Sequence, residues 1–275
     1  MFAYRRQYCG PVRAVIVDLA GTIVDYGSRA PAGVFEELFR RNGVQITTAQ
    51  AREPMGMHKR AHIQAVTAMP AVAEKWLAAH GSACTEADID RMYDEFVPLQ
   101  LEALPQHTDG IPGALELLSR LQDEGIGIAT TTGYNREMAQ VVLDSLARQG
   151  FEPDAAVCAA DVPAGRPAPW MIFRAMELLG VYPPDAVVSI GDTLADVESA
   201  LNAGVWSVGA AKTGNMLALS QAEMAALSEG ELQARLDKAY ATLHQAGAHF
   251  VVDGVADCCP VLERIHELLR RAGVG

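Results

Sequence analysis

The sequence predicts an α/β protein built on a parallel β-sheet, with an all-helical segment inserted after the first strand. Three observations predict this fold class. Short apolar runs rich in β-branched residues alternate with longer helical patterns from about residue 111 onward, as expected of strands covered by helices on both faces. The chain has 275 residues, half of them hydrophobic, which is enough for one large core and a smaller inserted domain. Between about residues 30 and 106 the pattern is helix after helix, with no convincing strand.

Six segments have the composition of sheet strands. They are Val12–Asp18, Gly127–Thr132, Ala155–Ala159, Ala186–Ile190, Trp206–Gly209 and His249–Val252. Reactive groups of parallel sheets gather at the carboxyl ends of the strands. Asp18, Thr132 and Asp192 each fall at such an end. We therefore expect a Rossmann-like core whose chemistry lies at one edge of the sheet.

The inserted segment is expected to form a cap over the strand ends. Its predicted helices are Ala32–Asn42, Ala49–Arg52, Met55–Ala68, Ala71–Ala79 and Glu86–Leu104. Linkers rich in turn formers flank it at Tyr26–Pro31 and Pro105–Gly110. We expect residues 1–27 and 106–275 to form the catalytic core and residues 28–105 the cap domain, which would exclude water. A further long helical pattern, from Ser220 to Gln245, suggests no function.

The amino-acid composition indicates which kinds of binding partner and which cellular compartment are expected. The net charge of -12 argues against nucleic acid as a partner. The five cysteines are odd in number and contain no C-x-x-C pair, which fits a reduced, cytoplasmic compartment. Nothing approaches the ~20 apolar residues of a membrane span. A soluble protein with a small-molecule partner is expected.

Asp18 ends the first strand and is followed by Leu19-Ala20-Gly21-Thr22. A strand that delivers a carboxylate into a Gly-Thr turn can present a nucleophile to a phosphoryl group. The alternative is an aspartate that only caps a helix or a turn. Two further motifs favour the nucleophile.

The first of these motifs is Gly191-Asp192-Thr193-Leu194-Ala195-Asp196, which follows a strand and leads into a helix. Asp18 and Asp192 at neighbouring strand ends would form an all-oxygen site suited to Mg²⁺. Such a cation would offset the repulsion between a carboxylate nucleophile and an anionic substrate. Asp196, one turn further, could support that site or be an exposed helix residue.

The second motif is Thr130-Thr131-Thr132-Gly133, at the end of another strand. A hydroxyl and free backbone N–H groups there can bind phosphoryl oxygens. Arg166, in Ala164-Gly165-Arg166-Pro167, is expected to open a helix after a further strand and can grip phosphoryl oxygens with two donors. The alternatives are that the threonines are there because β-branched residues favour strands, and that Arg166 is an ordinary surface residue.

In this order the motifs resemble the haloacid dehalogenase superfamily of aspartyl phosphotransferases. The resemblance implies that Asp18 is the nucleophile, that Thr132 holds the phosphoryl group and that Arg166 fills the usual lysine position. It also implies that Mg²⁺ is bound by Asp18, by Asp192 and by the carbonyl of Ala20.

Ala20 is a departure from that superfamily. Most such chains carry a second aspartate there, which moves a proton onto or off an oxygen leaving group. Its absence makes a phosphate ester a poor substrate. Cleavage of a C–P bond leaves a carbanion instead, and a lysine Schiff base conjugated to the departing carbon would accept those electrons. The chain should then contain a lysine that the cap brings over Asp18.

Lys59 is the candidate for that lysine. Helical spacing would place Met55, Lys59 and His62 on one face of a helix. Burial would lower the pKa of the amine, and His62 could shuttle protons directly or through water. The alternatives are a solvated surface lysine, and a metal site made of His58 and His62, for which no acidic partner is near.

Within the superfamily, the resemblance narrows to hydrolases that cleave the C–P bond of a phosphonate aldehyde. It implies conversion of phosphonoacetaldehyde to acetaldehyde and phosphate with Mg²⁺, usually by a homodimer, with Lys59 as the Schiff base and Met55, Gly133 and Tyr134 against the substrate. Ser28 stands where a cysteine can occur. The motifs are Asp18-x-Ala20-Gly21-Thr22, Val24-Asp25-Tyr26-Gly27, Met55-Gly56-x-x-Lys59-x-x-His62, Thr131-Thr132-Gly133-Tyr134, Asp161-Val162-Pro163-Ala164-Gly165-Arg166-Pro167 and Pro169-Trp170.

Three rival functions are open at this point. A phosphatase or phosphomutase of the same superfamily needs the acid that Ala20 lacks. A scaffolding protein without activity would not need Asp18, Lys59, Thr132 and Asp192 together. A Schiff-base aldolase would leave the Mg²⁺ carboxylates without a purpose.

Overall fold

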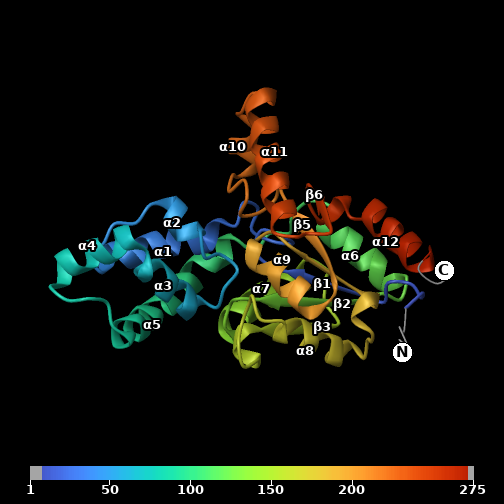
Figure 1. Cartoon of the computed structure of the whole chain (residues 1–275), viewed down its shortest axis with the longest axis horizontal. Coiled ribbons are helices and arrows are strands. Elements are labelled where there is room, and N and C mark those ends of the chain that lie inside the picture. The colour runs from blue at the N-terminus through green and yellow to red at the C-terminus, as the bar shows by residue number, and fades with distance from the viewer. Residues whose placement is uncertain (1–7, 272–275) are drawn as a thin grey trace, which may run out of the picture.

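The computed structural model describes residues 8–271, which form a sheet-containing core and a lobe of helices at one end (Figure 1). The sheet has six parallel strands in the order β3-β2-β1-β4-β5-β6. This confirms the predicted Rossmann-like core. The strands are β1 (Ala14–Asp18), β2 (Gly127–Thr132), β3 (Ala155–Cys158), β4 (Val187–Gly191), β5 (Trp206–Ala210) and β6 (Phe250–Val252), each within two residues of its predicted bounds.

Helices cover both faces of this sheet, which explains why its strands are predominantly apolar on both faces. Ala14 and Ile16 of β1 belong to one apolar cluster with residues of α8 and α9, whereas Val15 and Val17 belong to another with residues of α6 and α12. Successive strand residues point to opposite faces, so both sets are buried. The bounds are α6 (Ala114–Asp123), α7 (Arg136–Arg148), α8 (Trp170–Leu179), α9 (Leu194–Ala203) and α12 (Cys259–Arg271).

The inserted lobe contains five helices and no strand among the described residues (Figure 1). Its centre is apolar, and the rings of Phe35 and Phe96 stack there with centroids 4.6 Å apart. An inserted helical cap is therefore observed, while its division from the core at residues 28 and 105 stays a prediction. The helices are α1 (Arg29–Arg41), α2 (Thr48–Arg52), α3 (Lys59–Ala68), α4 (Pro70–His80) and α5 (Glu86–Ala103).

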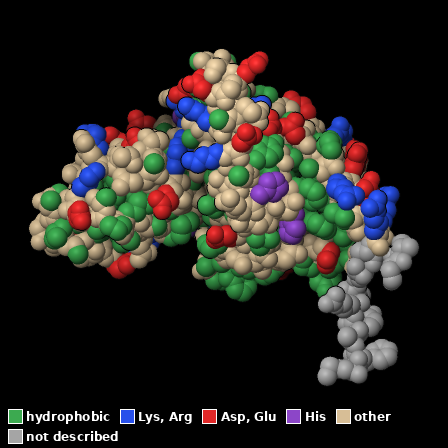
Figure 2. Space-filling view, turned by 45° about the horizontal axis from the view of Figure 1, so that its top comes forward, with side chains coloured by type: hydrophobic (Ala, Val, Ile, Leu, Met, Phe, Trp, Pro, Cys, Tyr) green, Lys and Arg blue, Asp and Glu red, His purple; other side chains and the backbone are tan. Residues whose placement is uncertain are grey.

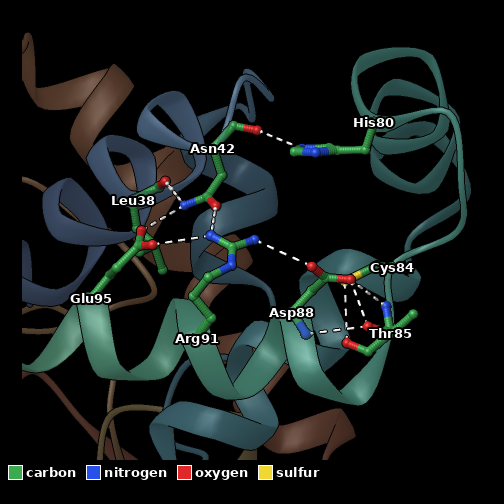
Figure 3. A network of polar contacts seen from close by, with 8 residues as sticks. All are labelled: Leu38, Asn42, His80, Cys84, Thr85, Asp88, Arg91 and Glu95. Atoms are coloured by element: carbon green, nitrogen blue, oxygen red, sulfur yellow. Dashed lines mark hydrogen bonds and ion pairs between the residues drawn. The ribbon is translucent and has the colours of Figure 1, made fainter.

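A polar network joins α1, α4 and α5 in this cap (Figure 3). Arg91 donates to Asn42 at 2.7 Å and to Glu95 at 3.0 Å. Asn42 in turn donates to Glu95 at 2.9 Å, and His80 Nε2 lies 2.9 Å from the Asn42 carbonyl oxygen. None of these residues lines the cavity between core and cap described below, so we treat the network as structural.

Two local predictions are wrong. The helix expected at Met55–Ala68 begins only at Lys59, because the preceding residues form a turn in which Gly56 has a φ of 91°. Arg166 does not open a helix; it lies in a turn before Trp170, where α8 begins.

The long pattern from Ser220 to Gln245 is two helices, α10 (Gln221–Ala225) and α11 (Glu229–Gln245). Ser228 interrupts the pattern because its hydroxyl accepts a hydrogen bond from the backbone N–H of Glu231, as an N-cap does. These two helices project from the core (Figure 1). Across the described residues, every helix is too short or too polar to cross a bilayer.

Candidate active site

The sheet order brings the predicted strand-end residues together. β1 lies between β2 and β4, and Asp18 pairs in register with Thr131. Asp192 directly follows β4. Three chain segments far apart in sequence thus meet at the carboxyl edge of the sheet, as predicted for a parallel sheet.

A small cavity lies at this edge, between core and cap. The core contributes Asp18, Thr132 and Arg166 to its lining. The cap contributes Met55 and Lys59. The structure therefore places the predicted nucleophile and the predicted Schiff-base lysine around one cavity.

Arg166 is buried at the base of this cavity and makes four short contacts. One nitrogen, Nη1, lies 2.6 Å from Asp18 Oδ1 and 2.8 Å from Asp196 Oδ1. The other, Nη2, donates to the Thr131 carbonyl at 2.9 Å and to its hydroxyl at 2.6 Å. Burial lowers the pKa of Arg166, but the charges of Asp18 and Asp196 outweigh it, so the guanidinium stays protonated.

Asp196 is buried, which excludes the alternative of an exposed helix residue. It accepts hydrogen bonds from the backbone N–H of Thr193 at 3.1 Å and from its hydroxyl at 2.5 Å. Together with its ion pair to Arg166, these contacts fix the first turn of α9 beside Asp192.

Asp18, Asp192 and Asp196 form a buried cluster of carboxylates, with one oxygen of each within 4.8 Å of the others. Burial, followed by the charges of Asp18 and Asp196, raises the pKa of Asp192 well above its ordinary value. Across residues 8–271, no lysine or arginine forms an ion pair with Asp192. The cluster is short of positive charge, and buried oxygen ligands of this kind fit a divalent cation such as Mg²⁺. Ala20 lines the cavity beside it.

Lys59 is the first residue of α3, and only 4% of its surface is exposed. Its Nζ lies 5.1 Å from the ring centroid of Tyr134 and 5.8 Å from that of Phe35. Burial lowers the pKa of Lys59 to about 8, against the opposing charge of Asp18. The alternative of a solvated surface lysine is therefore excluded. About one amine in ten is uncharged at pH 7, far more than for an ordinary lysine.

The pKa of Asp18 is raised to about 6 by burial, although Arg166 lowers it. Above that pH the carboxylate is ionised. It then combines the charge of a nucleophile with an arginine that holds one of its oxygens in place.

His62 is not brought to the cavity. Its ring stacks on Phe35 with centroids 3.7 Å apart, and its Nε2 lies 2.9 Å from the Ala51 carbonyl oxygen. Burial and the nearby Lys59 lower its pKa well below the ordinary value. The metal site of His58 and His62 is also unsupported, because within the described chain only the three aspartates form a cluster suited to a metal.

The remaining predicted residues surround the cavity. Thr132 and Gly133 line it, and the Thr132 hydroxyl accepts a hydrogen bond from the backbone N–H of Tyr134 at 3.2 Å. A Cβ on Gly133 would lie 2.5 Å from the Met57 carbonyl oxygen, so the cap turn rests directly on this core loop. The Tyr134 hydroxyl is buried and has no hydrogen-bond partner among the described residues. The ring of Tyr134 forms the wall of the cavity next to the Lys59 amine.

Sequence reasoning missed two contributors. Thr131 binds Arg166, and the backbone N–H of Asn215 donates to Asp192 Oδ2 at 2.6 Å. Thr131 belongs to the threonine cluster identified in the sequence, but the sequence does not indicate that its partner is Arg166. Asn215 follows β5, so its place near the carboxyl edge of the sheet was the one available signal.

Comparison with known proteins gives a consistent family. The model of the haloacid dehalogenase-like hydrolases matches residues 12–204. A curated phosphonoacetaldehyde hydrolase of Nitratidesulfovibrio vulgaris is 44% identical over 270 residues, which cover 98% of this chain and 96% of that protein. A phosphonoacetaldehyde hydrolase of Paraburkholderia phytofirmans is also 44% identical, over 94% of this chain and 97% of its own length.

Solved structures agree with these sequence matches. A phosphonoacetaldehyde hydrolase-like protein from Oleispira antarctica has a TM-score of 0.96 and 38% identity, with 98% of both chains covered. A β-phosphoglucomutase from Clostridium difficile has a TM-score of 0.66 and 17% identity, which shows a shared fold alone.

Proposed function

Because this chain belongs to the haloacid dehalogenase-like hydrolases, and because relatives named phosphonoacetaldehyde hydrolase match it nearly end to end, we propose that it hydrolyses the C–P bond of phosphonoacetaldehyde to acetaldehyde and phosphate. One observation carries the proposal. A buried lysine with a lowered pKa and a buried strand-end carboxylate line one cavity, and the position two residues after that carboxylate is an alanine.

In the first step the free amine of Lys59 attacks the aldehyde carbon, and loss of water gives an imine. Burial keeps part of the amine uncharged, which this attack requires. The protonated imine nitrogen is then conjugated through the imine carbon to the carbon that bears phosphorus. The protonated imine can accept the electron pair of the breaking C–P bond. An acid at position 20 could only protonate an oxygen leaving group, so it could not take this role.

In the second step Asp18 attacks phosphorus. The C–P bond breaks, and its electrons move into the imine to give an enamine on Lys59 and an acyl phosphate on Asp18. Arg166 and Thr132 stabilise the charge on the transferring group, since both line the cavity. Proton addition to the enamine carbon and hydrolysis of the imine release acetaldehyde and free Lys59. Water attacks the acyl phosphate, releases phosphate and regenerates Asp18.

We propose that Asp18, Asp192 and the Ala20 carbonyl hold Mg²⁺, with Asp196 supporting the site through Arg166 and Thr193. When bound, the cation supplies positive charge that offsets repulsion between the carboxylates and the phosphonate. The burial and mutual closeness of these carboxylates support this assignment.

The cavity wall supports a substrate-binding role for Met55, Gly133 and Tyr134. The proton shuttle predicted for His62 stays a prediction, and its contacts with Phe35 and Ala51 do not support it. The cytoplasmic location, the homodimer and the division into a core of residues 1–27 and 106–275 and a cap of residues 28–105 are likewise proposals.

The test is phosphate release from phosphonoacetaldehyde by the wild type and by Lys59→Arg, each with and without Mg²⁺. We expect release only by the wild type with Mg²⁺. Lys75→Arg is the matched control, because Lys75 is a cap lysine on the surface. Comparable turnover of sugar phosphates by the wild type would favour a phosphatase instead.

A further inference from the structure

The loop that follows β5 contacts the stretch between Asp18 and the cap at two points, and it also contacts Asp192, which is far from that stretch in the sequence. The backbone N–H of Gly27, in the first linker to the cap, donates to the Thr213 carbonyl at 2.7 Å. The Thr213 hydroxyl donates to the Gly21 carbonyl, in the turn after Asp18, at 2.9 Å. The backbone N–H of Asn215 donates to Asp192 Oδ2 at 2.6 Å. One loop thus links the cap hinge, the nucleophile turn and the buried carboxylate.

Asp192 is held tightly by this loop. A Cβ on Gly214 would lie 2.2 Å from Asp192 Oδ2, and a Cβ on Gly21 would lie equally close to the same oxygen. The carboxylate therefore lies directly against both backbone segments. Because Asn215 also holds this oxygen, a shift of the loop would reorient Asp192.

The cap reaches this loop through Arg52, at the end of α2. Its Nη1 donates to Asn215 Oδ1 at 3.0 Å and to the Gly27 carbonyl at 3.2 Å. The Asn215 side-chain nitrogen lies 3.5 Å from the Arg52 carbonyl oxygen, so the contact runs in both directions. Figure 2 shows Lys and Arg side chains at the join between the two lobes.

Arg52 is costly to place here. Burial lowers its pKa, and its buried Nε has no hydrogen-bond partner among the described residues. A buried donor without a partner has lost its hydrogen bond to water and gained none in return. A residue selected only to stabilise the cap would gain little from this position.

We propose that Arg52 and Asn215 form a clasp that couples closure of the cap to the orientation of Asp192. With the cap closed, Arg52 fixes Asn215, and Asn215 fixes the carboxylate. The clasp rests on the proposed function only in taking Asp192 as a ligand of Mg²⁺. Coupling is reciprocal, so Mg²⁺ should favour the closed cap by the same factor by which closure favours Mg²⁺.

The direction in which Mg²⁺ affinity changes when Arg52 is removed distinguishes the clasp from a purely electrostatic effect of its charge. Arg52 lies close enough to Asp192 for their charges to interact, so removing the arginine should by charge alone strengthen cation binding. The clasp predicts the opposite for Arg52→Met. Loss of a partner outside the ligand shell typically weakens metal binding about 10- to 100-fold, and we expect the lower end of that range. Asn215→Ala, which changes no charge, should weaken binding to a similar extent.

The effects of the two variants on Mg²⁺ affinity should not be additive. Both break the same contact, so Arg52→Met combined with Asn215→Ala should bind Mg²⁺ no more weakly than the weaker single variant. Arg60→Met is the matched control. Arg60 is a cap arginine that pairs with Glu86 and Asp90 on the surface and does not line the cavity.

The test uses the full chain without substrate. Mg²⁺ affinity is measured by titration calorimetry, and hydrogen exchange is followed at Gly27 and across residues 105–110 with and without Mg²⁺. We expect Mg²⁺ to slow exchange at these linkers in the wild type and in Arg60→Met. In Arg52→Met and Asn215→Ala we expect affinity about tenfold weaker and no slowing, with thermal unfolding recorded to confirm that each variant is folded.

Two results would overturn the clasp: wild-type affinity and slowing in both variants, or no slowing by Mg²⁺ in the wild type. Should Arg52→Met not fold, Asn215→Ala still decides. Because neither readout involves turnover, inactivity toward phosphonoacetaldehyde would sink the proposed function and leave the clasp standing. Wild-type activity toward phosphonoacetaldehyde, combined with wild-type Mg²⁺ affinity and exchange slowing in both variants, would support the proposed function and overturn the clasp.

Discussion

The rate of C–P cleavage should follow the uncharged form of Lys59, so its pH dependence reports the buried amine. The perturbation is pH alone. Burial lowers the pKa of Lys59 to about 8, and the nearby charge of Asp18 keeps it from falling further. Asp18 titrates at about 6, so the two groups should be separable.

The expected magnitude follows from these values. With a pKa of about 8, roughly one amine in ten is uncharged at pH 7, whereas an ordinary lysine at about 10.5 has roughly one in 3,000. The burial of Lys59 is therefore worth a factor of about 300 in reactive amine at pH 7. Between pH 6 and pH 7 the uncharged amine increases about tenfold, and ionisation of Asp18 contributes a further factor of about two. The value of kcat/KM should therefore rise about 15- to 20-fold from pH 6 to pH 7 and level off above about pH 8. A cation bound nearby would move the inflection lower, not toward 10.5.

The assay is initial phosphate release at limiting phosphonoacetaldehyde from pH 5.5 to 10, with Lys75→Arg as the control for general pH effects. An inflection near 10.5 would show an ordinary, solvated lysine. A flat profile from pH 6.5 to 9 would show that no amine of this pKa takes part in the reaction. Either result would refute the reasoning from burial.

Three further predictions concern the stability and kinetics of single variants. Lys59→Met should abolish turnover yet stabilise the fold by about 3 kcal/mol at pH 7, because a pKa lowered from 10.5 to about 8 disfavours folding below pH 8. That penalty fades as pH rises from 8 to 10.5, so denaturant unfolding should show the advantage at pH 7 and little at pH 10.5; an equal gain at both would contradict it. Gly56→Ala should lower kcat strongly and stability by about 1–3 kcal/mol, since φ is 91° and the new Cβ would lie 2.3 Å from the Thr193 hydroxyl; unchanged kinetics would show that the turn can relax. Arg91→Ala should lower the unfolding free energy by about 1–2 kcal/mol through loss of its bond to Asn42, without changing KM; a large rise in KM would tie the network in Figure 3 to the site.

The sheet could be predicted because its signal is local. Strands buried on both faces are short, apolar and β-branched, and nothing else in the chain has that composition. The meeting of Asp18, Thr132 and Asp192 followed from a general property of parallel sheets, namely that their carboxyl ends share one edge. These inferences needed no knowledge of side-chain packing.

The cap was harder to predict because spacing does not say which way a helix faces. The spacing of Met55, Lys59 and His62 suggested one catalytic face, yet the helix begins at Lys59 and His62 packs against Phe35. Gly56 was the available signal, because a glycine with positive φ ends a helical pattern.

Apart from the placement of Lys59 over Asp18, contacts across the interface of cap and core could not be predicted. Arg52 and Asn215 are 163 positions apart, and neither belongs to a motif that we recognised. Their meeting depends on how the cap rests on the core. The burial of Asp196 depends likewise on its ion pair with Arg166.

The central claim is that Lys59 holds the aldehyde while Asp18 takes the phosphoryl group. Borohydride reduction with phosphonoacetaldehyde present, followed by mass spectrometry of the peptide that contains Lys59, tests both parts together. We predict a two-carbon adduct without phosphorus on Lys59 of the wild type, and the same adduct with its phosphonate still attached in Asp18→Asn. No adduct at Lys59 in either protein, or loss of phosphorus in Asp18→Asn, would contradict the account.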